Sequence, residues 1–469
     1  MVIINALLAF ANWFWGIPLL LLCGVGGLVI GFYLGFPWFR HFGYIMSQTF
    51  GKMFGKSNGE GNVSAFAAAT SALASAIGAS NIVGVPVAIA LGGPGAVFWI
   101  EIMALIGFGT KFMEVVCGLA YRHKNAEGEY VGGPFYYCRQ IGKEGSPLRK
   151  LGAFFGTFYA FMLMVELVPS LASQSASATQ QGVAIGIPQI AIAIVVALIT
   201  AIVVIGGAKR VASVTDKMVP IMAAIYLVGA FIVIIMNISA LPAAIGSIFR
   251  YAFTGKAAAG GFAGATFSAC LRWGLARGLY SNEAGFGTTC ASHCSASVDH
   301  PVRQGAWGIF EVFVDTTIVC TTTALVILTT GVYELEGIET GALAQAAYHS
   351  VFGSFGQYFV AICVFLFVLS TMLACAFYGM KQAEFLFGLK FSKVWVWIYI
   401  IACIVGGMGY DLGLLYSLTD AFLGLIIIPN VVCLLLLLPR VKVLVKEYYN
   451  TPGKYFLADM EAKKAKKSA

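Results

Sequence analysis

One apolar stretch constrains the fold of this chain more than any other feature. From Ser71 to Gly95 the sequence is long and apolar enough to cross a bilayer, yet Gly78, Pro86 and a Gly-Gly-Pro-Gly run interrupt it. A membrane helix satisfies its backbone polar groups internally, so a break at membrane depth survives only where the freed groups line a polar cavity. The stretch therefore predicts a broken membrane helix beside a cavity.

The Ser-Asn-x-x-Gly pattern of this stretch recurs in the second half of the chain. It stands at residues 80–84 and again at 281–285, with Gly78 before the first copy and Gly278 before the second. Two broken hydrophobic segments at corresponding places of two halves indicate a secondary transporter with a site near the bilayer midplane. We therefore expect a second break near Gly278.

Composition supports an integral membrane protein. The 469 residues are 59% hydrophobic and 11% charged, whereas soluble domains have about 25% charged residues. We predict an all-α protein with 11 transmembrane helices in one domain, residues 1–450, and a basic cytoplasmic tail, residues 451–469. The predicted spans are residues 15–37, 63–90, 96–121, 151–180, 185–207, 215–237, 261–285, 303–330, 355–380, 394–410 and 412–438.

The basic residues indicate the orientation of these spans. Alternate connections together with the tail carry 24 of the 29 Lys and Arg residues, whereas the opposite side carries only Arg250 and Lys256 besides an acidic cluster. Because basic loops stay in the cytoplasm, we expect the N-terminus outside and the C-terminus inside the cell membrane. The net charge of +8 then favours anionic lipid headgroups over nucleic acid. Nothing in the sequence indicates an obligate protein partner.

The two copies of the pattern divide the spans into repeats. The span at 15–37 stands outside them as an extra helix, which leaves five spans in residues 63–237 and five in 261–438. Two consecutive copies of an odd number of spans enter the membrane from opposite sides. The sequence therefore predicts a five-plus-five inverted repeat.

The first break also suggests a substrate. A half-helix that begins near Ser80 has free N–H groups that favour an anion, and one that ends near Ala76 presents carbonyl groups that favour a cation or an ammonium group. This is the charge pattern of a zwitterionic amino acid, and it requires no charged side chain. In the alternative interpretation, Gly78 only kinks a packed helix.

Several motifs resemble those of the alanine or glycine:cation symporter family, which belongs to the amino acid-polyamine-cation superfamily. They are the stretch at 78–95, GGPFYY at 132–137, RGLYSNEAGFG at 277–287, and HPVRQG at 300–305. The resemblance implies a leucine-transporter (LeuT) type of fold and sodium-coupled uptake of small neutral amino acids. Where the family commonly has Gly-Thr-Gly-Asn, this chain has Gly78-Ala79-Ser80-Asn81, so Ser80 adds a side chain at the pocket.

The resemblance and the residues together give a predicted site. By resemblance, the N–H groups of residues 78–81 bind the substrate carboxylate, and backbone carbonyls with two hydroxyls bind the cation. The substrate-binding candidates are Ile77, Gly78, Ala79, Ser80, Asn81, Gln174, Trp273, Gly274, Gly278 and Ser281. The sodium-binding candidates are Ala74, Ile77, Phe367, Ser370 and Thr371.

Each polar or aromatic candidate also has a plainer interpretation. Hydroxyls in membrane helices often bond the carbonyl four residues back, which would explain Ser370 and Thr371. Gln174 could instead bond a neighbouring helix, and Trp273 could be a packing or interfacial residue rather than a cover over the substrate.

Ionisable residues at membrane depth are usually paired. Lys111 and Glu114 lie three apart on one helix face, so we expect them to pair with each other. We expect inter-helix pairs at an inward gate among Arg272, Arg277, Glu283, Glu311 and Asp315. Glu166 has no partner in its own span, and either a structural hydrogen bond or a role in binding a proton or second cation would explain it.

The sequence does not favour catalysis. The five histidines form no metal-spaced pair, and no Walker motif is present. We therefore predict a symporter, not an enzyme, that imports alanine or glycine with Na⁺ as the co-transported ion. Proton coupling, or an uncoupled facilitator or channel of the same fold, is the alternative.

Overall fold

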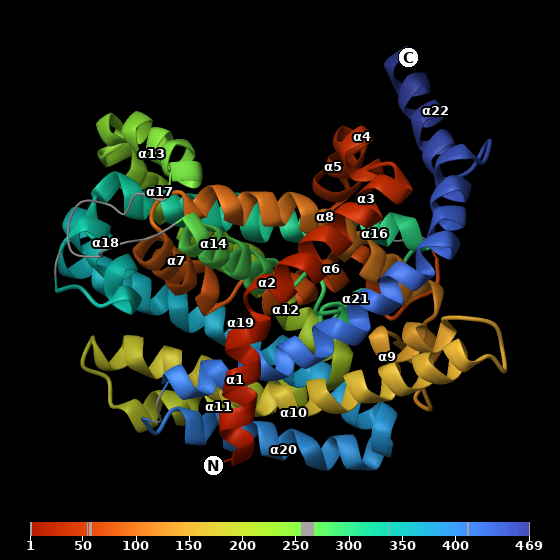
Figure 1. The fold of residues 1–469 in the computed structure, drawn as a ribbon, viewed down its shortest axis with the longest axis horizontal. Helices are drawn as coiled ribbons and strands as arrows, with labels where there is room; N and C mark the ends of the chain where they lie inside the picture. Colours follow the sequence, from red (N-terminus) through yellow and green to blue (C-terminus); the bar gives the residue numbers. More distant parts are fainter. Residues whose placement is uncertain are drawn as a thin grey trace.

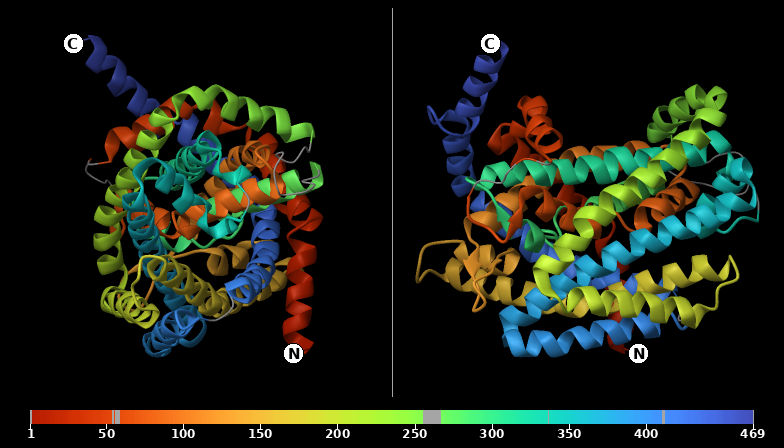
Figure 2. Two further views of the ribbon diagram at one scale, coloured as in Figure 1. Left: turned by 90° about the vertical axis from the view of Figure 1, so that its left-hand side faces the viewer. Right: turned by 180° about the vertical axis from the view of Figure 1, so that it is seen from behind.

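Long helices pack side by side in two groups that lie one above the other in Figure 1 and are seen from other sides in Figure 2. These spatial groups differ from the two halves of the sequence. The computed structural model describes residues 2–53, 55, 59–254, 267–335, 337–409 and 412–468. The helices α8, α14 and α16 pack together in one group and α10, α11 and α20 in the other, while α19 and α21 pack against α10. The first residues of the predicted seventh span, 261–266, and Glu336 of the acidic cluster lie outside the described residues.

The first half of the chain contains a short N-terminal helical segment, the broken helix and four long helices. Its elements are α1 (Val2–Phe14), α2 (Ile17–Leu19), η1 (Leu20–Val25), α3 (Gly26–Leu34), α4 (Pro37–Arg40), α5 (Phe42–Thr49), η2 (Phe50–Lys52), β1 (Val63–Ser64), α6 (Ala65–Ala76), η3 (Ser80–Gly84), α7 (Val85–Gly92), α8 (Ala96–Ala120), β2 (His123–Lys124), β3 (Tyr130–Val131), α9 (Pro134–Tyr137), η4 (Cys138–Gln140), α10 (Pro147–Val183), α11 (Gln189–Val204) and α12 (Gly207–Met236). The strands β2 and β3 pair antiparallel, whereas β1 pairs in parallel with β4 of the second half.

The second half contains the second irregular segment and four further long helical segments, one of which, residues 301–330, comprises several elements. Its elements are η5 (Ile238–Ala240), α13 (Leu241–Thr254), α14 (Phe267–Asn282), α15 (Cys290–His293), β4 (Ala296–Ser297), α16 (Pro301–Val312), η6 (Phe313–Cys320), α17 (Thr321–Thr330), η7 (Val332–Glu334), η8 (Thr340–Ala342), α18 (Leu343–Phe352), α19 (Ser354–Phe387), α20 (Leu389–Gly406), α21 (Leu412–Asn450) and α22 (Tyr455–Ser468). The helices α1, α13 and α18 were not predicted from the sequence.

The helices confirm an all-α membrane protein. Among the described residues, eight helices are long and apolar enough to cross a membrane, and a ninth span is counted if the bent pair α6 and η3–α7 is one. The predicted spans 185–207 and 261–285 correspond to α11 and α14, each 16 residues long in the described chain. The number of 11 spans therefore stays a prediction.

The predicted first break is confirmed. The helix α6 ends at Ala76, and the chain bends by 48° before it continues as the π-helical turn η3 and then α7. Ile77 has non-helical backbone angles, with φ −77° and ψ 89°. The bend comes where Gly78 leaves the backbone without a shielding side chain.

The predicted break near Gly278 is wrong, because α14 continues without interruption to Asn282. A β-carbon on Gly274 would lie 2.5 Å from the carbonyl oxygen of Ala96, and one on Gly278 would lie 2.9 Å from that of Ile100. These glycines form a small-xxx-small face that lets α14 approach α8 closely. The chain leaves the helix only at Glu283, where φ is +52°.

This contact gives a test of the packing. Gly274→Ala forces the backbones of α14 and α8 apart, and overpacking of this kind typically costs 1–3 kcal/mol, or about a few degrees of thermal stability. Gly246→Ala on α13 is the control, because nothing lies within 4 Å of its β-carbon position. Thermal unfolding of both variants in detergent measures the difference. Equal melting temperatures would contradict the close approach.

The C-terminal helix α22 contacts α5 and α16 through side-chain hydrogen bonds and ring contacts. Asp459 accepts hydrogen bonds from Tyr44 (2.6 Å) and from Arg303 (2.8 Å). The His41 ring lies edge-on to that of Phe456 with centroids 4.9 Å apart, and the ring of His300 lies 4.6 Å from that of Tyr455. The tail is therefore held by an ion pair and by two ring contacts of histidines.

These histidines make tail docking sensitive to pH. Burial lowers the pKa of His41, and the charge of Arg40 adds to the effect; burial also lowers the pKa of His300, against the opposing charge of Glu447. Docked histidines thus favour the neutral form, so their contribution is complete above the ordinary pKa of about 6.5 and falls as the pH drops below it. We expect faster proteolysis of the tail at pH 5.5 than at pH 7.5. A His41→Phe/His300→Phe double variant should lose this difference, and the same difference in the variant would contradict the assignment.

Candidate functional site

The first break is stabilised by the side chain of Asn81. Its Oδ1 accepts a hydrogen bond from the N–H of Gly78 (2.9 Å), and its own N–H donates to the carbonyl of Gly78 (3.2 Å). Its Nδ2 donates to Oδ1 of Asp315 in η6 (2.6 Å) and to Oγ of Ser281 in α14 (3.3 Å). Asn81 is completely buried, so it ties the bent segment to two other helices rather than facing a cavity.

Asp315 is the hydrogen-bond acceptor for several polar groups next to the break. Its second carboxylate oxygen accepts hydrogen bonds from Ser281 and from Thr316 (2.9 Å). The repeated Ser-Asn pairs thus lie side by side in space, since Ser281 and Asn81 are in direct contact. This cluster holds α14, η3 and η6 in fixed positions relative to one another.

The second irregular segment runs from Glu283 to Thr289 between α14 and α15. Gly285 has a φ of +106°; its N–H donates to Oε1 of Glu114 (2.9 Å), and its carbonyl accepts from Asn430 (2.8 Å). Glu283 Oε1 accepts a hydrogen bond from Ser75 Oγ in α6 (2.7 Å), and Thr288 donates to its other oxygen. The two irregular segments therefore meet through Ser75 and Glu283.

Oxygen atoms converge where α19 crosses the first break. Ser370 Oγ lies 3.5 Å from the carbonyl oxygen of Ile77, and Thr371 Oγ1 lies 3.4 and 3.5 Å from those of Ser75 and Ile77. Both hydroxyls also donate to the carbonyl of Phe367, at 2.8 and 3.0 Å. A hydroxyl has one hydrogen, so each oxygen still presents a lone pair toward the break.

The spacing of these oxygens suits a cation. Separations of 3.4–3.5 Å are too long for good O–H···O bonds, which measure 2.5–3.0 Å. Octahedral ligands of a hard cation bound at about 2.4 Å, a distance typical of calcium, lie roughly 3.4 Å apart. The structure brings together the predicted Ile77, Phe367, Ser370 and Thr371. It adds Ser75, whereas the predicted Ala74 is not among the hydrogen-bond partners described for the two hydroxyls.

A small cavity of about 50 Å³ lies next to this group of oxygens. Four of the predicted residues line it, and they are Gly78, Ser80, Gln174 and Thr371. Sequence reasoning missed most of the other lining residues, among them Ser75, Ser170, Tyr280, Glu283, Phe286 and Thr288. One signal was available, because Glu166, Ser170 and Gln174 recur at every fourth position of α10 and so share one helix face.

The remaining predicted residues lie elsewhere. Gly274 and Gly278 face α8, and Trp273 packs beside Gly92 with Arg277 over its ring at 5.4 Å. Ala79, Asn81 and Ser281 are buried behind the break. Tyr280, two turns after Trp273, is the aromatic residue of α14 that lines the cavity. The predicted site needed no charged side chain, whereas two, Glu166 and Glu283, line the cavity.

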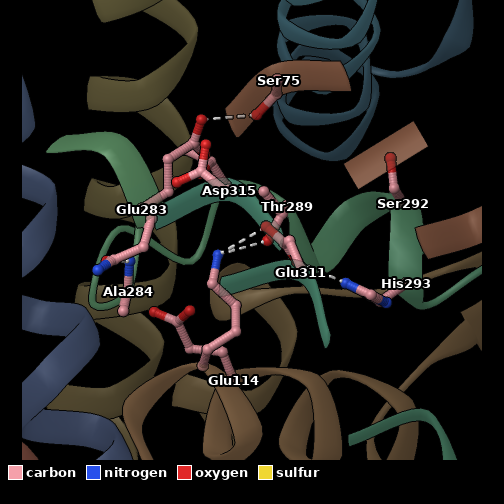
Figure 3. Close-up of polar contacts among 12 residues, drawn as sticks. Ser75, Glu114, Glu283, Ala284, Thr289, Ser292, His293, Glu311 and Asp315 are labelled. Carbon is pink, nitrogen blue, oxygen red and sulfur yellow. Dashed lines mark hydrogen bonds and ion pairs between the residues drawn. The ribbon is translucent and has the colours of Figure 1, made fainter. Parts of the chain in front are cut away.

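A buried ionic network adjoins the second irregular segment (Figure 3). Lys111 Nζ donates to Glu311 Oε1 (3.1 Å) and to Thr289 Oγ1 (2.9 Å), and Glu311 Oε2 lies 2.8 Å from His293 Nε2. The predicted pair of Lys111 with Glu114 is wrong, since Glu114 instead bonds Gly285 and Asn430. Glu311 on α16 reaches Lys111 directly, which the spacing within one helix could not indicate.

No group of three or more His, Cys, Asp or Glu residues suited to a metal ion occurs among the described residues. A helical membrane protein with a broken span, a small buried cavity and a group of oxygens beside it has the architecture of a membrane transporter.

Comparison with known proteins supports this class and specifies the family. A model described as the sodium:alanine symporter family matches residues 1–459. The chain therefore belongs to the sodium:alanine symporter family, which is a family of transporters.

Relatives and a solved structure agree with this assignment. The uncharacterized transporter YflA of Bacillus subtilis is 43% identical over 459 residues, covering 97% of this chain and 95% of its own. The sodium/alanine symporter AgcS of Methanococcus maripaludis is 36% identical over 372 residues, covering 77% and 79%. A crystal structure of a manganese transporter of Eremococcus coleocola, in complex with an aromatic bis-isothiourea substituted compound, covers 82% and 79% with a TM-score of 0.50 at 14% identity. The last likeness concerns the fold alone.

Proposed function

We propose that this protein imports small neutral amino acids, alanine or glycine, together with Na⁺ by alternating access. The observation that carries the proposal is the convergence of Ser370, Thr371 and the carbonyls of Ile77 and Ser75 at the break. Sodium would bind among these oxygens, with the Phe367 carbonyl orienting the two hydroxyls. The name of the relative AgcS, a sodium/alanine symporter, supports the same ion and substrate.

The substrate carboxylate would lie at the start of the half-helix η3–α7. The first N–H groups of a helix lack intrahelical partners. Here the N–H of Gly78 is bonded to Asn81 Oδ1, and that of Asn81 to the carbonyl of Gly78. The N–H of Ser80, a residue that lines the cavity, would therefore receive the carboxylate. A cavity of about 50 Å³ holds only a few water molecules and favours small side chains.

The topology of the proposed transporter follows the charge pattern. We propose 11 spans, a leucine-transporter type of fold with inverted repeats in residues 63–237 and 261–438, and a cytoplasmic C-terminus. Movement of α6 and the second irregular segment relative to α19 would then open the cavity to alternate sides.

Counterflow in proteoliposomes tests this proposal against its alternatives. Labelled alanine should accumulate above its outside concentration when an inward Na⁺ gradient is imposed, and a proton gradient alone should not drive it. Accumulation driven by protons alone would identify a proton symporter. Equilibration without accumulation under either gradient would identify an uncoupled facilitator or channel.

A further inference from the structure

Two carboxylates face the cavity without an ion-pair partner among the described residues. Glu166 on α10 and Glu283 at the second irregular segment both line it. Neither belongs to any of the ion pairs found within 4.0 Å among the described residues. The buried cation on this side, Lys111, bonds Glu311 instead. Two carboxylates that share a buried site do not both stay ionised unless a cation accompanies them.

An independent observation points to a donor-rich ligand at the same place. Gln174 lines the cavity and is only 7% exposed, and its Oε1 has no hydrogen-bond partner among the described residues. A buried unpaired acceptor costs free energy until a donor reaches it. Glu166, Ser170 and Gln174 share one face of α10, so their oxygens approach the cavity from one side while Glu283 lies on the other.

We propose that Glu166, Glu283 and Gln174 form the subsite for the ammonium group of the amino acid, and that it selects for a primary amine. This inference rests on the proposed function. A primary ammonium group has three N–H donors, and the subsite supplies an acceptor from each of three side chains. Thr371, which is one of the residues proposed to bind Na⁺, and Ser80 line the same cavity. The ammonium subsite and the proposed sodium site are therefore neighbours. The carboxylates would offset the positive charge that both ligands bring.

N-methylation of the substrate combined with mutation of the subsite provides the test. Each methyl group on glycine removes one N–H donor, so glycine, N-methylglycine and N,N-dimethylglycine form a series for competition against labelled alanine at fixed Na⁺. Glu166→Gln should weaken glycine binding about 10- to 100-fold, the value of a hydrogen bond to a charged group, and weaken N,N-dimethylglycine far less. The steric effect of the methyl groups is common to both proteins and cancels in the cycle.

Two further variants make the result decisive. Glu101→Gln removes a carboxylate that is hydrogen-bonded to Thr321 and does not line the cavity. Its affinities for the three ligands should therefore match those of the unmutated protein. Gln174→Leu removes only a neutral acceptor, so it should also weaken glycine more than N,N-dimethylglycine, but by a smaller factor. This variant replaces Glu166→Gln in the test if Glu166→Gln does not fold. Equal losses for all three ligands, with a higher Na⁺ requirement, would assign the carboxylates to the metal ion and overturn the proposal, as would no loss at all. Alanine binding that ignores Na⁺ in the unmutated protein would contradict the proposed function but leave the methylation series readable.

Discussion

Replacing Ser370 and Thr371 together by alanine should raise the Na⁺ concentration needed for half-maximal alanine uptake by about 100-fold or more. Each hydroxyl places an oxygen within 3.5 Å of the Ile77 carbonyl, and the loss of charge-assisted contacts of this kind costs about 1.5–3 kcal/mol each. Uptake at saturating Na⁺ should be affected much less, because neither residue would contact the substrate carboxylate. Sodium titration of uptake into proteoliposomes measures both quantities.

A buried threonine elsewhere in the membrane provides the control. Thr200 on α11 is completely buried and donates to the carbonyl of Val196 (2.8 Å), so Thr200→Ala removes a comparable hydroxyl away from the break. Its Na⁺ dependence should match that of the unmutated protein. If Ser370→Ala/Thr371→Ala also left the Na⁺ dependence unchanged, these hydroxyls would not belong to the cation site.

Replacing Lys111 by methionine should destabilise the protein by about 3–5 kcal/mol, the typical cost of an uncompensated buried charge. Lys111 and Glu311 are fully buried, with their charged atoms 3.1 Å apart, and among the described residues Glu311 would keep His293 as its ion-pair partner. The double variant Lys111→Met/Glu311→Leu should recover much of the loss, because apolar replacement of a whole buried pair is often neutral. Thermal unfolding in detergent measures each step.

An exposed ion pair provides the control, because it shows how much stability the same substitution removes where water solvates the charges. Lys393 and Glu127 lie 3.3 Å apart with side chains 62% and 47% exposed, and pairs of this kind contribute at most about 1 kcal/mol. Lys393→Met should therefore leave the melting temperature almost unchanged. A similarly small effect of Lys111→Met would mean that Glu311 is not charged in the folded protein.

The sequence predicted the first break better than the second because the two glycines are used differently. At Gly78 a β-carbon would lie 2.7 Å from Thr371 Oγ1, and the backbone leaves the helix there. At Gly278 the same residue type serves helix packing. A glycine in an apolar run is compatible with either use, and only the neighbouring helix decides between them.

Most of the oxygens proposed to bind Na⁺ could be predicted from the sequence, and the position of Glu283 at the cavity could not. Adjacent hydroxyls in an apolar run, combined with a family resemblance, led to Ser370 and Thr371. Glu283 reaches the cavity because its φ of +52° turns the chain out of α14, and no periodicity indicates such a turn. The partner of Lys111 was missed for a related reason, since spacing along one helix says nothing of residues such as Glu311 on another.

Binding measurements on the purified protein test the central claim most directly. If a small amino acid and Na⁺ share the break between α6 and η3, each must raise the affinity of the other by the same factor. Alanine affinity measured across Na⁺ concentrations, and Na⁺ affinity measured across alanine concentrations, should therefore give one common coupling factor, which Ser370→Ala/Thr371→Ala reduces. Alanine binding with the same affinity in the presence and absence of Na⁺ would contradict the account.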